Sequence, residues 1–277
     1  LKMDKAIISP IICLLFILII GVSHGSLDHL KGKKLLKIFK LNNILFFYLS
    51  YTILAITTIF FWTLFPATTL IIFLIVASFH FGKEDTQFLI YENSYINQFL
   101  FLCKGSLIVL APLLFHFDET LNIFKLLLIE NETFYTSFNI IEKNKLINIG
   151  IVLSTLSSIF LFLKKFELKK FTIFLDYFSI IIINYYFTPL IAFTIYFCFL
   201  HSFRHSISLM VELDQESLKN GFLIFIKKAL PLTILTAILC LVSLYFMNEN
   251  YSLDSSIFKI IFIGLASLTF PHILLEY

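Results

Sequence analysis

Nine apolar segments, separated by short polar stretches, make up most of this chain of 277 residues. A helix needs about 20 apolar residues to cross the hydrocarbon core of a membrane, which is about 30 Å thick. The pattern therefore predicts an all-α fold, a polytopic integral membrane helix bundle with about nine transmembrane helices. The predicted helices cover residues 5–24, 43–65, 67–82, 96–116, 147–164, 171–188, 189–210, 229–247 and 257–275.

The composition excludes an ordinary soluble protein. Hydrophobic residues make up 59% of the chain and charged residues only 14%, whereas globular chains carry about 25% charged residues. The net charge of +3 is spread over several loops and forms no basic arm, so we expect no nucleic-acid partner. The four cysteines lie far apart within apolar segments, and we interpret them as buried apolar side chains.

We expect a single transmembrane domain over residues 1–277 with one insertion. Residues 118–146 hold charged residues and asparagines around an apolar stretch too short to cross a membrane, which indicates an extramembrane or interfacial segment. Pro66 and Pro189 mark tight turns between helices. Pro231 is expected in the first turn of a helix, where proline is tolerated.

The lysines are distributed unevenly between the two sets of alternating loops. By the positive-inside rule, the lysine-rich set is cytoplasmic and the N-terminus is external. The protein is therefore expected to be a multi-pass membrane protein with a defined orientation. The densest cluster follows the first predicted helix and consists of Lys31, Lys33, Lys34, Lys37 and Lys40.

Six of the seven histidines lie at or near the ends of strongly apolar segments. A histidine in a membrane helix is costly and indicates a functional site, and histidine is the commonest metal ligand. Five of them lie toward the C-terminal ends of odd-numbered helices, so they share one depth at the cytoplasmic leaflet, whereas His116 lies on the opposite side. The five histidines at the cytoplasmic depth predict a metal centre inside the bundle. They are His24, His80, His201, His205 and His272.

Spacing separates the candidate ligands. The sequence HSFRH at 201–205 places two imidazoles on one face of an α-helix, a spacing that helical metal sites use. His24 and His29 are separated by about 140° around a helix, so we favour His24 as a ligand. His80 precedes a glycine that we expect to end its helix. The predicted ligands, which would also be the catalytic residues, are His24, His80, His201 and His205.

Other residues are assigned possible supporting roles around the metal or in a substrate pocket. Arg204 requires a carboxylate or backbone partner at its depth, and Asp28 or Asp85 would also orient a ligand imidazole. His272 stays open as a fifth ligand, an outer donor or a pocket residue, and His29 as an outer or surface residue. Aromatic residues that would line an apolar pocket are Phe79, Tyr196, Phe203 and Phe270.

The ligand type limits the metal and its chemistry. Ligation by imidazoles alone suits iron, copper, zinc or nickel. Four neutral histidines leave one or two coordination positions open, as in a site for O₂ or a substrate. A redox metal inside a bilayer is well placed to oxidise a lipid-soluble molecule.

Four short blocks resemble the signature sequences of the Brp/Blh family, the bacteriorhodopsin-related proteins that act as β-carotene 15,15′-dioxygenases in microbes that use rhodopsins. The resemblance covers essentially the whole chain in order and topology, and the four blocks together are specific although each alone is not. The blocks are HGSLDH at 24–29, HFGKED at 80–85, HSFRH at 201–205 and PHILLE at 271–276.

The resemblance implies a bacterial inner-membrane enzyme with one non-haem Fe(II) per chain. It would cleave the central 15,15′ double bond of β-carotene with O₂ into two retinal molecules, which would pass to a microbial rhodopsin. The family's proposed ligand set of four histidines matches His24, His80, His201 and His205.

Two alternatives stay open on the residues alone. A membrane di-iron desaturase or hydroxylase also uses histidines at the cytosolic ends of helices, but it needs more histidines, and this chain has no adjacent histidine pair. A non-enzymatic membrane protein that binds haem or another metal would need only two axial imidazoles, which would leave the other histidines on that side unexplained.

Overall fold

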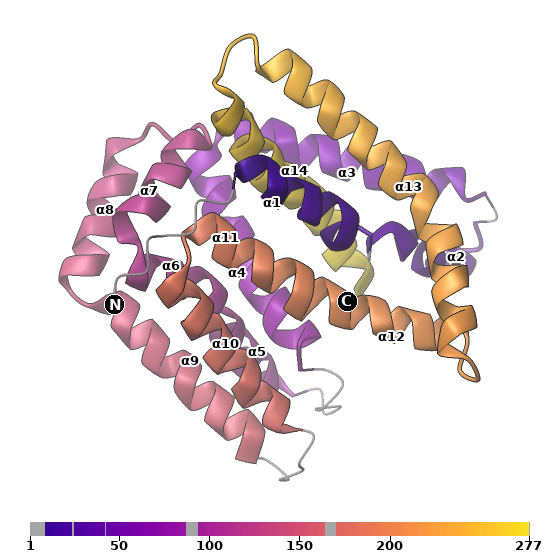
Figure 1. Cartoon of the computed structure of the whole chain (residues 1–277), viewed down its shortest axis with the longest axis horizontal. Coiled ribbons are helices and arrows are strands. Elements are labelled where there is room, and N and C mark those ends of the chain that lie inside the picture. The colour runs from indigo at the N-terminus through magenta and orange to yellow at the C-terminus, as the bar shows by residue number, and fades with distance from the viewer. Residues whose placement is uncertain (1–8, 24, 42, 87–93, 164–169, 277) are drawn as a thin grey trace. The chain divides into compact units, whose positions relative to one another are not determined.

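The computed structural model describes residues 9–23, 25–41, 43–86, 94–163 and 170–276 (Figure 1). Within these ranges every regular element is a helix, so the predicted all-α class is confirmed. Among the described residues, eight helices are long and apolar enough to cross a membrane, as expected for a multi-pass membrane protein. They are Pro10–Ile38, Leu45–Leu64, Pro66–Glu84, Tyr95–Phe115, Leu146–Leu163, Pro189–Leu213, Leu218–Met247 and Leu253–Leu275.

The helix predicted at 171–188 is present but shorter than these eight. Phe171–Tyr186 is apolar and has 16 residues. At 1.5 Å per residue it is about 24 Å long, which is less than the thickness of a typical hydrocarbon core. Whether this helix crosses the membrane decides the orientation of everything that follows it, so the predicted orientation stays a prediction.

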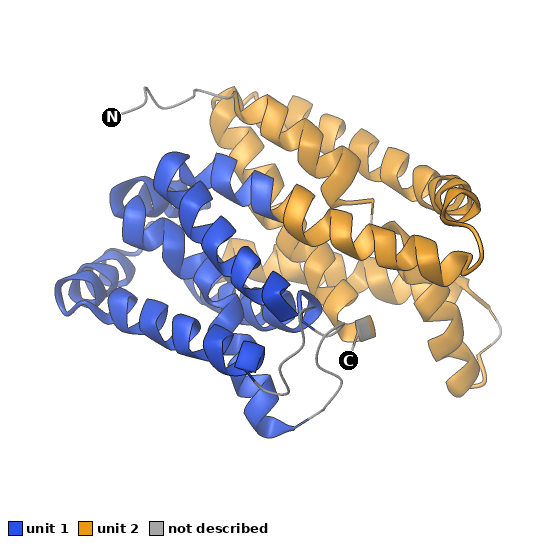
Figure 2. Cartoon of the chain, turned by 60° about the horizontal axis from the view of Figure 1, so that its bottom comes forward, with its two compact units in different colours: residues 1–8, 66–196 blue, residues 9–65, 197–277 orange. Residues whose placement is uncertain are grey.

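The helices group by their contacts into two compact units, which are described separately (Figure 2). Unit 1 holds residues 66–196 together with the N-terminal 1–8, which lie outside the described residues. Unit 2 holds residues 9–65 and 197–277. A single domain over the whole chain stays a prediction.

Unit 1 is a helix bundle with a small apolar core. The pairs α4–α5 and α5–α9 share its most extensive contacts, and α6 and α10 also pack on α9. Phe101, Leu161 and Ile173 are buried together, with Phe79 against them. The helices are α4 (Pro66–Glu84), α5 (Tyr95–Gly105), α6 (Leu107–Phe115), α7 (Phe117–Leu126), α8 (Glu132–Lys143), α9 (Leu146–Leu163), α10 (Phe171–Tyr186) and α11 (Pro189–Ile195).

Two glycines bring the backbones of α4 and α5 into direct contact. A Cβ atom on Gly82 would overlap the carbonyl oxygen of Phe101, and one on Gly105 would overlap the carbonyl oxygen of Ser78. Small residues at helix interfaces allow this approach, on which helix association in lipid depends. The prediction that Gly82 ends its helix was wrong, because α4 continues to Glu84.

The predicted insertion at 118–146 forms the two short amphipathic helices α7 and α8. Asn131 caps α8, where its Oδ1 accepts hydrogen bonds from the backbone N–H groups of Thr133 and Phe134. The Tyr135 hydroxyl donates to the carbonyl oxygen of Ile129 over 2.7 Å, and burial raises the pKa of Tyr135 to about 12. Neither helix is among those long enough to cross a membrane, while the interfacial position itself stays a prediction.

Unit 2 is built around α14, which packs against α1, α3 and α13, while α12 packs against α13. Pro231 lies inside α13, so its predicted place in a first turn was wrong: the helix starts 13 residues earlier, at Leu218, where Ser217 caps it. The helices are α1 (Pro10–Phe16), α2 (Asp28–Ile38), α3 (Leu45–Leu64), α12 (Phe203–Leu213), α13 (Leu218–Met247) and α14 (Leu253–Glu276).

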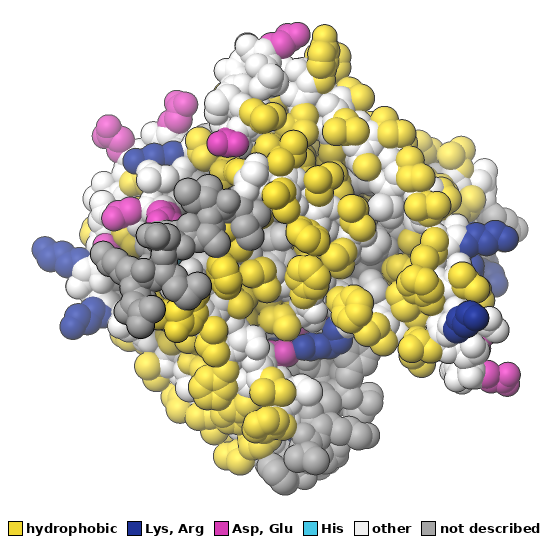
Figure 3. Space-filling model, in the orientation of Figure 1, with side chains coloured by type: hydrophobic (Ala, Val, Ile, Leu, Met, Phe, Trp, Pro, Cys, Tyr) yellow, Lys and Arg dark blue, Asp and Glu magenta, His cyan; other side chains and the backbone are white. Residues whose placement is uncertain are grey.

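The surface of the long helices is apolar. Large hydrophobic side chains that are about half exposed line α3 and α13, among them Ile53, Phe60, Leu235 and Leu239. Figure 3 shows hydrophobic side chains predominating on the face that it draws. Such extended apolar surface is rare on soluble monomers, and it fits helices surrounded by lipid.

Candidate metal centre

The predicted metal ligands fall into three groups. His80 lies in α4 of unit 1 and is 2% exposed. His201 and His205 lie in unit 2 and are 2% and 7% exposed. His24 lies outside the described residues. Within the ranges that the structure describes, no three His, Cys, Asp or Glu side chains are grouped closely enough to hold a metal ion, so the ligand set stays a prediction.

His201 lies in a π-helical segment, Tyr196–Ser202, which joins α11 to α12. A second π-helical segment, Ile17–Gly21, follows α1 and ends three residues before His24. π-Helical turns are rare and occur frequently at functional sites. The sequence argument assumed one regular α-helix through HSFRH, and this detail was wrong, because only His205 belongs to α12.

The two π-helical segments touch each other within unit 2. A Cβ atom on Gly21 would lie 2.5 Å from the ring of Phe197, so a larger residue there would require this ring to shift. The Phe197 ring stacks on the imidazole of His201, with centroids 6.0 Å apart and planes inclined by 16°. The Ser202 hydroxyl donates to the carbonyl oxygen of Gly21 over 3.4 Å. The end of the first membrane helix is thereby fixed against the segment that carries His201.

A buried hydrogen-bonded network joins three helices of unit 2. The Nδ1 atom of His272 in α14 lies 2.9 Å from both carboxylate oxygens of Asp28 in α2. The hydroxyl of Tyr51 in α3 lies 3.0 Å from Asp28 Oδ2 and 3.1 Å from the carbonyl oxygen of Leu268. Asp28 and His272 are 5% and 6% exposed, so this network lies in the interior.

The imidazole ring of His272 also contacts that of His205. The two imidazoles pack edge to face, with centroids 6.3 Å apart and planes at 84°. Asp28 and His272 therefore lie beside His205 in the interior of unit 2, while their supporting roles around a metal stay predictions. Tyr51 was missed, because it lies mid-helix outside the four blocks and nothing in its local sequence marks it.

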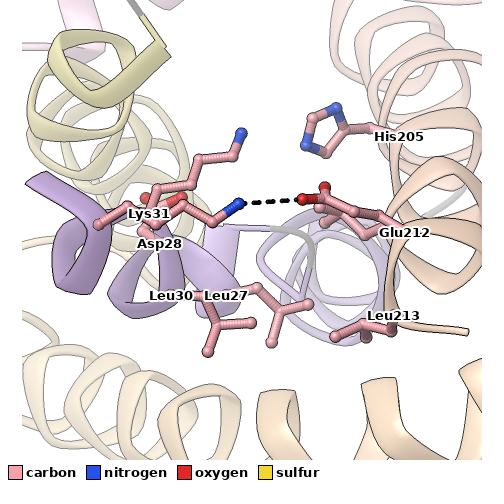
Figure 4. Close-up of a pocket in the computed structure, with 9 residues that line it drawn as sticks. Leu27, Asp28, Leu30, Lys31, His205, Glu212 and Leu213 are labelled. Atoms are coloured by element: carbon pink, nitrogen blue, oxygen red, sulfur yellow. Dashed lines mark hydrogen bonds and ion pairs between the residues drawn. The ribbon is translucent and has the colours of Figure 1, made fainter.

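A cavity of about 250 Å³ borders Asp28 and His205 (Figure 4). Buried Asp28 and His205 line one part of it, and the exposed ion pair Lys34–Glu212, with Nζ and Oε1 3.3 Å apart, lines another. The cavity thus leads from a charged surface to an imidazole of the predicted ligand set. The remaining lining residues are Leu27, Leu30, Lys31, Leu209 and Leu213.

In unit 1, a second carboxylate, that of Asp85, ends the block that contains His80. The hydroxyl of Tyr196 donates to Asp85 Oδ2 over 2.7 Å. Its ring packs edge to face on Phe81, with centroids 5.4 Å apart. Tyr196 is 1% exposed, so it is a buried anchor for the end of α4. Along the chain it precedes His201 by five residues.

The remaining candidate residues differ in burial and in their hydrogen-bond partners. The Nδ1–H group of His29 donates to the carbonyl oxygen of Ser26 over 3.0 Å. Phe203 is 53% exposed, whereas Phe79 packs in the unit 1 core. Arg204 and Phe270 are half-buried. His116 donates through Nε2 to the carbonyl oxygen of Asn184 over 2.7 Å, a structural role in agreement with its exclusion from the predicted site.

The donor chemistry fits a divalent transition metal. Imidazoles are the preferred ligands of iron, copper, zinc and nickel in proteins, and those of His80, His201, His205 and His272 are buried. Metal-bound histidines almost always donate their other ring N–H group to a carboxylate, a backbone carbonyl or water, and Asp28 provides such an acceptor for His272.

Comparison with known proteins points to one family. The family model described as beta-carotene 15,15′-dioxygenase matches residues 15–277. The curated beta-carotene 15,15′-dioxygenase of uncultured marine bacterium 66A03 is 27% identical to this chain over 267 residues, which cover 95% of this chain and 90% of that protein. No solved structure matches the chain.

Proposed function

The chain belongs to the β-carotene 15,15′-dioxygenase family, and we propose that it cleaves the central double bond of β-carotene with O₂ to give two retinal molecules. The observation that carries this proposal is the family match over residues 15–277, which includes all four histidine blocks. In the reaction, the double bond between C15 and C15′ breaks and each carbon receives one oxygen atom of O₂. The electrons balance, so no further reductant is needed.

The proposed cofactor is one non-haem Fe(II) per chain, held by His24, His80, His201 and His205. The bound metal would supply the redox chemistry toward O₂. Burial supports the assignment for His80, His201 and His205, because ionisable residues inside a membrane bundle mark functional sites. The rest of the support comes from the family's sequence blocks.

The chain's own residues would bind the substrate and exclude water. β-Carotene is an apolar polyene that resides in the bilayer, and the exposed surface of the long helices is apolar. Buried aromatic side chains beside the proposed ligands, Phe197 on His201 and Tyr196 near the end of α4, would contact the polyene and stabilise positive charge developing on it.

The orientation and partners belong to the same proposal. The lysine cluster from Lys31 to Lys40 favours an active site toward the cytoplasmic leaflet of a bacterial inner membrane. Retinal is itself lipid-soluble, so the product would stay in the membrane, where a microbial rhodopsin would take it up.

Expression in bacterial cells that accumulate β-carotene tests the activity. The wild-type chain should remove the orange colour and produce retinal, which chromatography identifies. His201→Ala should abolish retinal formation while the protein still inserts, and His116→Ala serves as the matched control because His116 is a histidine outside the proposed set. A wild-type protein that inserts but forms no retinal would refute the activity, and a fully active His201→Ala variant would refute the ligand assignment.

A further inference from the structure

We infer that His272 is a further ligand of the metal centre, and that Asp28 and Tyr51 are positioning residues that fix the orientation of its imidazole. The inference rests on the proposed function only in requiring that the chain binds a divalent metal. It extends the set of four histidines with a residue from the last helix.

The hydrogen bonds of His272 determine which ring nitrogen faces a metal. Carboxylate oxygens only accept hydrogen bonds, so the Nδ1 atom, 2.9 Å from both oxygens of Asp28, carries a proton. In a neutral imidazole, Nε2 then carries the lone pair that binds a metal. Metal-bound histidines almost always donate their other N–H group to a carboxylate, a carbonyl or water.

A second layer of contacts holds Asp28 in turn. Tyr51 donates its hydroxyl proton to Asp28 Oδ2 while lying 3.1 Å from the carbonyl oxygen of Leu268, one turn before His272 in α14. The carboxylate is therefore fixed from α3 and the imidazole from α2. This arrangement positions a ring more tightly than a single hydrogen bond would.

Charge balance supports the same assignment. Four neutral imidazoles leave the +2 charge of a bound metal uncompensated, and a buried carboxylate is itself costly without a compensating charge. A metal bound to His272 would place its positive charge on the far side of the imidazole from Asp28. The buried positive charge of the metal and the buried negative charge of Asp28 would then stabilise each other.

The position of His272 agrees with that role. Its ring packs edge to face on His205, which belongs to the proposed ligand set, and both residues lie in unit 2. The competing interpretation is a buried Asp28–His272 ion pair that only ties α14 to α2. That interpretation predicts no effect of His272 on the coordination of a bound metal.

Cobalt substitution separates the two interpretations. The full-length protein, purified in detergent, would be loaded with Co(II), whose visible absorption depends on the number and geometry of its ligands. We expect His272→Gln to change the Co(II) bands and to weaken Co(II) binding more than tenfold. Asp28→Asn should weaken binding about 10–100-fold, as loss of a residue that orients a ligand does, and Tyr51→Phe should weaken it less.

Two controls match these variants. His116→Gln removes a histidine outside the site, and Tyr48→Phe removes a tyrosine hydroxyl one turn before Tyr51 in α3, on a residue that is 37% exposed. Both should retain the wild-type Co(II) spectrum and affinity. If His272→Gln fails to insert, Tyr51→Phe and Asp28→Asn decide the question, because both leave the imidazole in place.

The outcomes are distinguishable from those of the proposed function. Unchanged Co(II) bands in His272→Gln would overturn the inference, even if Co(II) binding is weaker. If His272→Gln fails to insert, unchanged bands in both Asp28→Asn and Tyr51→Phe would overturn it instead. Either result would leave the proposed cleavage of β-carotene intact. Bands that depend on His272 in a protein that forms no retinal would support the inference and refute the proposed function. A wild-type protein that takes up no Co(II) would overturn the inference and the proposed metal centre together.

Discussion

Two regions that carry candidate histidines are built by different forces. His80 in unit 1 lies in a helix that meets its neighbour through glycine backbones, at Gly82 and Gly105. His272 in unit 2 is held by the carboxylate of Asp28, which in turn accepts a hydrogen bond from the Tyr51 hydroxyl. In lipid, apolar burial does not drive helices together, so close packing and hydrogen bonds between helices do this work. In this chain, close backbone packing positions the helix that carries His80, and hydrogen bonds position the imidazole of His272.

The largest expected effect falls on the close-packed region. Gly82→Ala should destabilise the protein by about 3 kcal/mol, because the added methyl group overlaps a backbone carbonyl that cannot move without shifting α5. Unfolding by denaturing detergent, followed by circular dichroism, measures the change. Gly264→Ala is the matched control, since nothing lies within 4 Å of its Cβ position, and it should be neutral or stabilising by up to about 1 kcal/mol. Equal stability of the two variants would mean that α4 and α5 do not touch there.

The hydrogen-bonded region should respond next. Asp28→Asn should cost about 2 kcal/mol in the metal-free protein, because the neutral amide replaces a charged acceptor of two buried donors. The same unfolding measurement applies. A loss as large as that of Gly82→Ala would indicate that polar contacts are as important for stability as helix packing.

Removal of one hydroxyl tests the outer part of the same network. Tyr51→Phe should cost about 1 kcal/mol, since Asp28 keeps its contact with His272. Tyr48→Phe should change the unfolding free energy by less. If both phenylalanine variants behave alike, the Tyr51 hydroxyl does not hold Asp28.

The exposed ion pair beside the cavity should matter least. The Lys34 and Glu212 side chains are 75% and 60% exposed, and such pairs contribute about 0–1 kcal/mol. Lys34→Ala should therefore change the unfolding free energy by no more than about 0.5 kcal/mol. High salt should abolish even this difference, and a larger, salt-resistant effect would show that the pair is structural.

Much of the fold could be predicted because hydropathy alone specifies membrane helices. The starts of the helices at Pro66 and Pro189 followed from proline placement to within one residue. The start of α13 did not, because proline at position 231 is accommodated inside a longer helix. Local residue preferences cannot decide whether Pro231 starts a helix or lies inside one.

The candidate site could be predicted only in part. The burial of His80, His201 and His205 followed from their places in apolar segments, and the proximity of Asp28 to an imidazole followed from its block. The close contacts at Gly21 and Gly82 and the hydrogen bond from Tyr51 to Asp28 arise from packing between separate helices, and the π-helical segments have no local mark in the sequence. A single sequence carries no local signal for such contacts.

Metal removal tests the central claim most directly. The measurement is the amount of retinal formed per β-carotene consumed by purified protein, before and after chelation and after reloading with Fe(II). The proposed function predicts two retinal molecules per β-carotene with iron, none after chelation and recovery on reloading. Retinal formation that persists after complete removal of the metal would contradict the claim that the histidines serve an iron-dependent cleavage.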